Sequence, residues 1–307
     1  MAEDRPLVWL PFEPAKLDDP PEGLRYETGA LSAEDPPGWA AEVEFYVPPY
    51  DVGSDQGSLF RVLPRLKVVQ TLTAGVDNIR DDVPEGVLLC NGRGIHNAST
   101  AELALTLTLA SLRGIPGFVH DQHEGRWHHG WRASLADKTV LIVGYGDIGH
   151  DVERRLLPFE VDVLRVARTS REGVRTLADL PELLPQADVV ILIIPGTSET
   201  KGLVDSTFLG SMKEGALLVN VARGGVVVTD DLVAALESGR IRAALDVTDP
   251  EPLPADHPLW KAPHVLITPH VGGATPAMWP RAYRLVREQL TRFAAGVPLE
   301  NVMSGEY

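Results

Sequence analysis

The clearest hydrophobic pattern lies in the second half of the chain, where short apolar runs alternate with helical segments. The runs 139–144 and 188–194 are apolar at almost every position, which is typical of strands buried on both faces of a parallel sheet. The expected strands are 139–144, 161–167, 188–194, 216–222, 242–247 and 264–268, and the expected helices are 147–157, 177–186, 206–212 and 229–239. Six strands with helical connections predict a Rossmann-type, doubly wound parallel sheet.

The first part of the chain has a weaker pattern of the same kind. Apolar runs at 7–10, 42–47 and 66–72 predict strands, and 58–64 predicts a short helix that Pro64 ends. Strands that alternate with helices form parallel sheets. We therefore expect an α/β protein with a second, flavodoxin-like α/β domain.

Two long helices set the expected domain bounds. Residues 97–114 predict a largely buried helix at a domain or subunit interface, with Asn97 or Ser99 as its cap and Glu102 completing a capping box. A final helix, 276–295, follows the second sheet and is expected to return to the first domain. The expected domains are 1–96 with 277–307, and 97–276.

Composition restricts the partners. Among the 307 residues, 28 basic and 43 acidic side chains give a net charge of −15, so neither nucleic acid nor an anionic membrane is an expected partner. No apolar run approaches the ~20 residues that span a bilayer. The first residues, MAEDRPLVWL, do not read as a secretory signal. A single cysteine, Cys90, excludes an intrachain disulfide and fits a cytoplasmic location.

A glycine pattern follows the first strand of the regular sheet. In GYGDIG, Gly144 permits a tight turn, Gly146 admits a pyrophosphate and Gly149 lets helix and strand pack closely, with Tyr145, Asp147 and Ile148 between them. The N-terminus of the following helix favours anions. The pattern predicts a dinucleotide site; the alternative is a glycine-rich turn of another α/β fold.

The end of the second strand indicates which dinucleotide binds. Ala167 stands where an NAD site has an acidic residue for the ribose 2′-hydroxyl. Four side chains suited to a 2′-phosphate follow, namely Arg168, Thr169, Ser170 and Arg171. We therefore expect NADP(H) to be preferred, with NAD(H) binding through the hydroxyls as the alternative.

Polar side chains come at or after the ends of three later strands: Arg223, Asp246 and His270. In an open α/β sheet, ligands bind at the carboxyl ends of the strands. A lone histidine after a strand is more often structural, Arg223 could form a structural ion pair, and Glu251 could be a loop acid. Their joint occurrence favours a catalytic site.

At these residues the sequence resembles the D-isomer-specific 2-hydroxyacid dehydrogenases. The resemblance covers nearly the whole chain and is carried by NVARGGVV, LDVTDPEP and TPHVGGAT. It implies Arg223, Glu251 and His270 as catalytic residues and Asp246 as a contact of the nicotinamide carboxamide. It also implies a two-domain enzyme with an interdomain cleft, usually a homodimer.

Further binding residues follow from the same resemblance. The segment TAGVDNI resembles the loop whose backbone N–H groups hold the substrate carboxylate, which implies substrate contacts at Ala74, Gly75 and Val76, together with Arg223 and His270. The remaining cofactor contacts are expected at Pro195, Thr200, Ala222 and Gly272. The segment IPGTSET departs mildly from the family at Gly196, which leaves more room near the cofactor.

These residue types suit the reduction of a 2-keto acid. His270 as imidazolium can donate a proton to the developing alkoxide, and Glu251 beside it would favour the charged form. Arg223 can bind the carboxylate and stabilise charge on the keto oxygen, while the cofactor supplies the hydride. We expect no metal; histidines at 120, 123, 128 and 129 have spacings that could suit one, but an exposed connection is the simpler interpretation.

The first-domain loop 47–58 contains no arginine or lysine and carries Asp51 and Asp55, which argues against a phosphorylated substrate. We expect a small 2-keto acid of the glyoxylate or hydroxypyruvate type. The alternatives are a reductase for a bulkier 2-keto acid and a non-catalytic NADP(H)-binding regulator, because the fold alone does not establish activity. Arg93 and His96 could contact substrate or lie at an interface.

Overall fold

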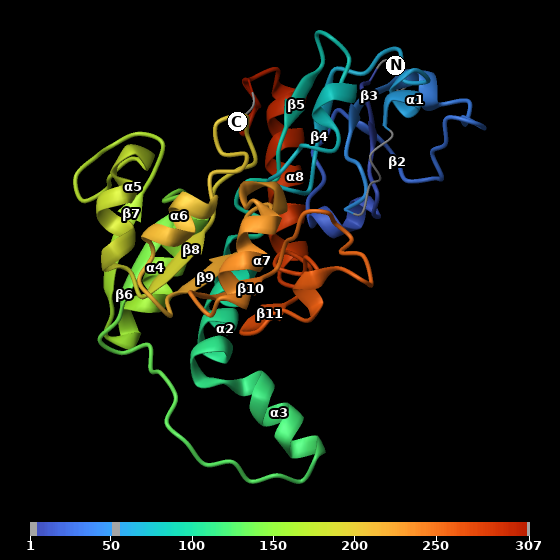
Figure 1. The fold of residues 1–307 in the computed structure, drawn as a ribbon. Coiled ribbons are helices and arrows are strands. Elements are labelled where there is room, and N and C mark those ends of the chain that lie inside the picture. Colours follow the sequence, from blue (N-terminus) through green and yellow to red (C-terminus); the bar gives the residue numbers. More distant parts are fainter. Residues whose placement is uncertain (1–4, 51–55, 306–307) are drawn as a thin grey trace. The chain divides into compact units, whose positions relative to one another are not determined.

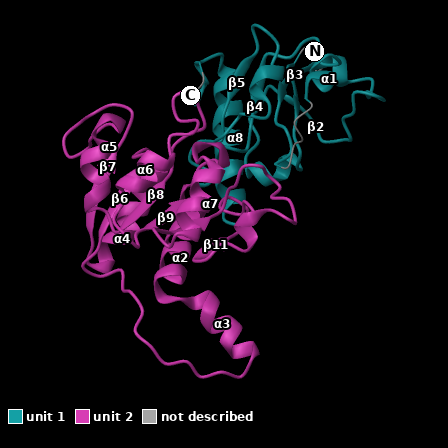
Figure 2. Cartoon of the chain, in the orientation of Figure 1, with its two compact units in different colours: residues 1–96, 276–307 teal, residues 97–275 magenta. Residues whose placement is uncertain are grey.

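A computed structural model describes residues 5–50 and 56–305 (Figure 1). The chain forms two compact units (Figure 2). Unit 1 consists of residues 1–96 and 276–307, and unit 2 of residues 97–275. The second boundary lies one residue before the expected position.

Unit 2 contains a six-stranded parallel sheet in the order β11-β10-β9-β8-β6-β7. Its strands are β6 (Thr139–Val143), β7 (Asp162–Val166), β8 (Val189–Leu192), β9 (Leu217–Asn220), β10 (Arg242–Leu245) and β11 (Val265–Ile267). All six predicted strands are present, each slightly shorter than its apolar run. The Rossmann-type prediction is confirmed.

The strand order places the switch of direction at β6. From β6 the chain passes first to β7 on one side and later to β8 on the other. Beyond β7, Arg175 forms an isolated parallel bridge with Val166, which marks the position of a third strand in a dinucleotide fold. Ligands of doubly wound sheets bind outside the carboxyl ends of the strands at such a point.

Helices cover both faces of this sheet because alternate strand residues face opposite cores. Leu141 and Val190 belong to the core packed against α5, α6 and α7. Their neighbours Val140 and Val189 belong to the core packed against α2 and α4. The helices are α2 (Asn97–Arg113), α3 (Ile115–His123), α4 (Asp147–Leu156), α5 (Leu180–Leu183), α6 (Ser206–Ser211) and α7 (Thr229–Glu237). Short 3-10 turns at each end of α5 complete the helix expected at 177–186.

Unit 1 contains a five-stranded parallel sheet in the order β2-β1-β3-β4-β5, which is the flavodoxin-like arrangement. Its elements are β1 (Leu7–Trp9), β2 (Arg25–Glu27), β3 (Val43–Tyr46), α1 (Gly57–Phe60), β4 (Val68–Gln70), β5 (Leu88–Cys90) and α8 (Met278–Ala295). The pattern did not predict β2 or β5. Both are three-residue edge strands, and β2 is polar and only half-buried.

The C-terminal helix α8 belongs to unit 1. Its residues Met278, Ala282 and Val286 share a core with Val8 and Phe45 of the unit 1 sheet. The side chain of Gln289 also donates a hydrogen bond to Gln70 Oε1 at 2.7 Å. The chain therefore crosses between units at residues 96–97 and again at 275–276.

The start of α2 differs from the prediction. The helix begins at Asn97, so Ser99 lies inside it rather than at its cap. The Ser99 hydroxyl contacts Thr275 Oγ1 at 2.6 Å, within unit 2. The expected capping box between Ser99 and Glu102 is therefore wrong, because the helix already begins two residues before Ser99.

The helix α3 and the chain that follows it lie away from the sheet of unit 2 (Figure 1). No residue of α3 is buried, and Trp127 and Trp131 are 94% and 97% exposed. The pattern did not predict α3, because Gly114, Pro116 and Gly117 all disfavour a helix interior. Within the described residues no single helix qualifies as a membrane span; only α2 and α3 taken together, bent by 64°, meet the length and composition criteria.

Candidate active site

The glycine turn after β6 is shaped by close backbone contacts. Gly144 has φ +110°, and a Cβ there would lie 2.3 Å from the carbonyl oxygen of Ile193. A Cβ on Gly149 would lie 2.5 Å from the carbonyl oxygen of Gly144, whereas one on Gly146 would meet nothing within 4 Å. The first and third glycines thus serve packing, and the open face at Gly146 fits the approach of a pyrophosphate.

The helix that follows the turn fits the same ligand. α4 begins at Asp147, directly after Gly146, and no side chain caps its first turn. Ile148 is half-buried against the sheet. Backbone N–H groups of Gly144 and Tyr145 both donate to the carbonyl oxygen of Val166 at 2.8 Å, which ties the turn to the end of β7. The residues present therefore fit a dinucleotide.

The segment after β7 forms a tight turn. Arg171 and Val174 exchange backbone hydrogen bonds of 3.2 and 2.9 Å across Glu172 and Gly173. All four predicted phosphate contacts are exposed: Arg168, Thr169, Ser170 and Arg171. Arg171 Nη2 donates to the carbonyl oxygen of Tyr145 at 2.7 Å. The turn thus brings this guanidinium to the glycine turn.

Two other predicted cofactor residues meet after β8. The hydroxyl of Thr200 donates to the carbonyl oxygen of Pro195 at 2.6 Å and accepts from the N–H of Thr197 at 2.9 Å. Gly196 lies inside this turn, and a Cβ there would lie 3.2 Å from Arg223 Cγ. The departure at Gly196 therefore makes room for the Arg223 side chain.

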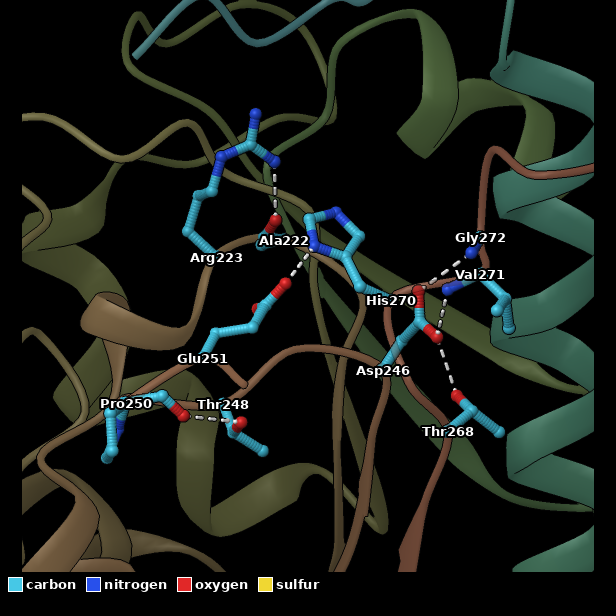
Figure 3. A network of polar contacts seen from close by, with 10 residues as sticks. All are labelled: Ala222, Arg223, Asp246, Thr248, Pro250, Glu251, Thr268, His270, Val271 and Gly272. Carbon is cyan, nitrogen blue, oxygen red and sulfur yellow. Dashed lines mark hydrogen bonds and ion pairs between the residues drawn. The ribbon is translucent and has the colours of Figure 1, made fainter. Parts of the chain in front are cut away.

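The three predicted catalytic residues come from loops after β9, β10 and β11, which are neighbours in the sheet. Figure 3 shows their side chains. Nδ1 of His270 is hydrogen-bonded to Oε1 of Glu251, with 49% and 40% of the two side chains exposed. Arg223 Nη1 donates to the carbonyl oxygen of Ala222 at 2.8 Å. The predicted pairing of His270 with Glu251 is thus present in the fold.

A glycine allows these loops to approach. A Cβ on Gly224 would lie 1.9 Å from the carbonyl oxygen of Thr248, so the chain just after Arg223 touches the chain leading to Glu251. The hydroxyl of Thr229 donates to the carbonyl oxygen of Asp249 at 2.6 Å and adds a second link between these segments. The ARGG sequence is needed for packing as well as for its arginine.

Asp246 holds the loop that carries His270. Its carboxylate is buried and accepts hydrogen bonds from Thr268 Oγ1 at 2.6 Å, Val271 N at 2.9 Å and Gly272 N at 2.8 Å. The N–H of His270 donates to the carbonyl oxygen of Asp246 at 2.7 Å. His270 has φ +53°, a left-handed conformation that is unfavourable for side-chain-bearing residues. The bonds on either side of His270 oppose this strain.

Sequence reasoning missed Asn220. This residue is 1% exposed, donates from Nδ2 to the carbonyl oxygen of Arg223 at 3.0 Å and accepts at Oδ1 from the N–H of Ala222 at 3.0 Å. It therefore fixes the turn that presents Arg223. The signal was a single amide in an apolar strand, because a buried polar side chain requires partners.

The predicted substrate loop lies in unit 1. The carbonyl oxygens of Ala74, Gly75 and Val76 accept hydrogen bonds from Asn91 Nδ2, Thr73 Oγ1 and the N–H of Arg80, at 3.0, 2.8 and 2.9 Å. These bonds fix the peptide planes of the loop.

The sequence did not decide the roles of His96 and of the histidines in the 120–130 segment. His96 is buried, with Nε2 2.9 Å from the carbonyl oxygen of Leu72. In the 120–130 segment, His128 pairs with Asp121 at 3.0 Å. No cluster of three metal-ligating side chains occurs in the described part of the chain.

The chain matches a known protein family. Residues 105–272 match the profile of the NAD-binding domain of D-isomer specific 2-hydroxyacid dehydrogenases. The chain is 38% identical to the human glyoxylate reductase/hydroxypyruvate reductase over 225 residues, 68% of each protein. It is 34% identical to D-3-phosphoglycerate dehydrogenase of Archaeoglobus fulgidus over 250 residues, which are 78% of this chain and 47% of that protein.

Solved structures resemble the whole chain. A D-isomer specific 2-hydroxyacid dehydrogenase from Xanthobacter autotrophicus Py2, in complex with NADPH and MES, is 32% identical with a TM-score of 0.81, covering 98% of each chain. An NADPH-dependent glyoxylate/hydroxypyruvate reductase from Sinorhizobium meliloti, in complex with NADP and malonate, is 26% identical with a TM-score of 0.80, covering 99% of this chain and 98% of that one. The chain therefore belongs to the D-isomer-specific 2-hydroxyacid dehydrogenase family of NAD(P)-dependent oxidoreductases.

Proposed function

We propose that this enzyme uses NADPH to reduce a small, unphosphorylated 2-keto acid of the glyoxylate or hydroxypyruvate type to the 2-hydroxy acid, with the D configuration where C2 is a stereocentre. The observation that carries the proposal is the hydrogen bond between His270, which follows β11, and Glu251, which follows β10. Arg223 follows β9, the next strand in the sheet. A binding module has no need of a hydrogen-bonded histidine–carboxylate pair together with an arginine. The regulator alternative is therefore less well supported.

The side chains would act on the substrate as follows. Because Nδ1 of His270 faces Glu251, Nε2 is the atom that would donate a proton to the keto oxygen as it becomes an alkoxide. The Glu251 carboxylate would orient the ring and stabilise the imidazolium. Arg223 would bind the substrate carboxylate and stabilise negative charge on the reacting oxygen. The bound nicotinamide would supply the hydride to C2.

The cofactor preference rests on the segment after β7. No acid follows Ala167 directly, and the exposed side chains from Arg168 to Arg171 combine two guanidiniums with two hydroxyls. A carboxylate there would repel a 2′-phosphate, whereas guanidiniums bind phosphate well. We expect a higher kcat/KM with NADPH than with NADH, measured at fixed keto acid. A clear preference for NADH would refute this part of the proposal.

The substrate class rests on the lack of basic residues in the first-domain loop 47–58. Residues 51–55 of that loop, with Asp51 and Asp55, lie outside the described residues. The fixed loop at Ala74, Gly75 and Val76 supports a carboxylate-binding role for its N–H groups. A panel of glyoxylate, hydroxypyruvate and a branched 2-keto acid would rank the small and the bulky alternatives. A higher kcat/KM for the branched acid would favour the bulky one.

A homodimer is part of the proposal. No residue of α3 is buried. In the chain that follows α3, the side chains of Trp127 and Trp131 are almost fully exposed. Aromatic side chains are enriched in protein interfaces, and a second copy of the chain would cover them. We expect Trp127→Ala with Trp131→Ala to lower the molar mass in light scattering, whereas Trp260→Ala should not. An unchanged mass would contradict this surface as the dimer contact.

We also propose a cytoplasmic location. The chain has one cysteine, and the Cys90 thiol is buried in unit 1, where burial raises its pKa to about 11. A protonated, buried thiol is unreactive. A fluorescent fusion found outside the cytoplasm would contradict the location.

A further inference from the structure

Tyr145 in the glycine turn is held at three points. Its hydroxyl donates a hydrogen bond to the carboxylate of Glu153 in α4. Its N–H donates to the carbonyl oxygen of Val166 at 2.8 Å, and its own carbonyl oxygen accepts from Arg171 Nη2 at 2.7 Å. This residue therefore links the turn, the helix behind it and the loop after β7.

The tyrosine hydroxyl is anchored to an ion pair whose carboxylate is buried and whose arginine is partly exposed. Glu153 is 7% exposed, and its carboxylate accepts from both Nε and Nη2 of Arg165 in β7, with a distance of 2.9 Å for the Nε bond. Arg165 holds the pKa of Glu153 below its ordinary value, while burial and then Glu153 raise the pKa of Tyr145. The phenol thus remains a donor to a carboxylate that remains charged.

The ring of Tyr145 also lies near two guanidiniums. Arg165 and Arg171 have their central carbons 5.7 and 5.5 Å from the ring centroid, within the range of cation–π attraction. The backbone of Arg171 is fixed by its turn with Val174. Both ends of Arg171 are consequently restrained, the main chain by the turn and the guanidinium by Tyr145.

We propose that Tyr145 is a specificity-determining positioning residue, which holds the Arg171 guanidinium at the glycine turn and so favours a 2′-phosphorylated adenosine ribose over an unphosphorylated one. The inference rests on the proposed NADP(H) preference and adds the residue that produces it. Long cationic side chains lose much rotamer freedom when they bind a phosphate. Tyr145 reduces that loss before the ligand arrives. A guanidinium has five N–H donors, so the bond to Tyr145 leaves capacity for phosphate.

Calorimetric titration with two fragments tests this without turnover. The measured quantity is the ratio of the Kd of 5′-AMP to the Kd of 2′,5′-ADP. Because the two fragments differ only in the 2′-phosphate, this ratio measures the contribution of that phosphate to binding. We expect Arg171→Ala to lower the ratio by about tenfold or more, and Tyr145→Leu by about fivefold. The double variant should match Arg171→Ala alone, because Tyr145 acts through Arg171. Phe159→Leu, an exposed aromatic change near the end of α4, should leave the ratio unchanged.

The outcomes separate this inference from its premise. A ratio near one in the wild type would refute the NADP(H) preference and remove the basis of the inference. A high wild-type ratio that Tyr145→Leu leaves unchanged, or additive losses in the double variant, would overturn the role of Tyr145 alone. If Tyr145→Leu fails to fold by circular dichroism, Tyr145→Phe decides. It removes only the bond to Glu153 and should lower the ratio by about twofold, whereas no change would overturn the inference.

Discussion

Removing the carboxylate of Asp246 should displace His270 although His270 itself is not substituted. The loop 268–272 is held by three hydrogen bonds to this buried carboxylate, from Thr268, Val271 and Gly272. Bonds to a charged group each contribute about 1.5–3 kcal/mol, so the three together give about 4.5–9 kcal/mol. Groups on the exposed side of the loop can form hydrogen bonds to water instead. The free energy lost with the carboxylate is therefore about half of that sum, roughly 2–4 kcal/mol.

That free energy matters because it opposes the left-handed conformation of His270. If it is lost, the arrangement with His270 against Glu251 is less populated, and each 1.36 kcal/mol corresponds to about tenfold in rate. We expect Asp246→Ala to lower kcat about 30-fold to 1000-fold at saturating cofactor. Thr268→Val removes one of the three bonds and should lower kcat about fivefold.

Two assays check this reasoning. Steady-state turnover gives kcat, and hydrogen exchange gives the protection of the N–H groups of Val271 and Gly272, which should fall in Asp246→Ala. Asp256→Ala, an exposed acid in the same connection, should change neither. A kcat within about twofold of the wild type together with unchanged protection in Asp246→Ala would refute the argument.

Two further substitutions test charge in unit 2. Glu251→Gln keeps a hydrogen-bond acceptor for His270 but removes the negative charge. Because both side chains are about half exposed, we expect the interaction with His270 to weaken by about 1–2 kcal/mol, which lowers kcat roughly tenfold. An unchanged kcat would contradict the role of Glu251. Glu153 has a lowered pKa through its bonds to Arg165, so its contribution to stability is complete above about pH 4.3 and is lost as the pH falls further. The difference in Tm between the wild type and Glu153→Gln should therefore shrink below about pH 4, and a difference that grows with acidity would be inconsistent with this. Glu214→Gln, an exposed control, should have little effect in either assay.

The sheet of unit 2 could be predicted from sequence because its strands are buried on both faces. Continuous apolar runs such as β8 have no other favourable location, and the glycines after β6 mark the turn. By contrast, β2 is a short polar edge strand whose pairing depends on β1, which no local pattern specifies. The helix α3 could not be predicted either, because its glycine and proline residues are unfavourable inside a helix.

The site could be predicted at the level of single residues but not of their supports. His270 and Glu251 stood out by motif. The role of Asp246 as the acceptor for the loop 268–272 depends on contacts more than twenty residues apart. Glu153 of α4 is buried although it is an acid, because it pairs with Arg165 of β7. Such long-range polar pairs leave no periodic signal.

The central claim, that His270 is the proton donor in 2-keto acid reduction, is tested most directly by NADPH oxidation with glyoxylate and hydroxypyruvate, comparing the wild type with His270→Ala. The account predicts turnover in the wild type and a loss of about 10²–10⁴ in kcat in the variant, with the Kd for NADPH unchanged. Near-normal turnover by His270→Ala, or no wild-type turnover with any 2-keto acid, would contradict it.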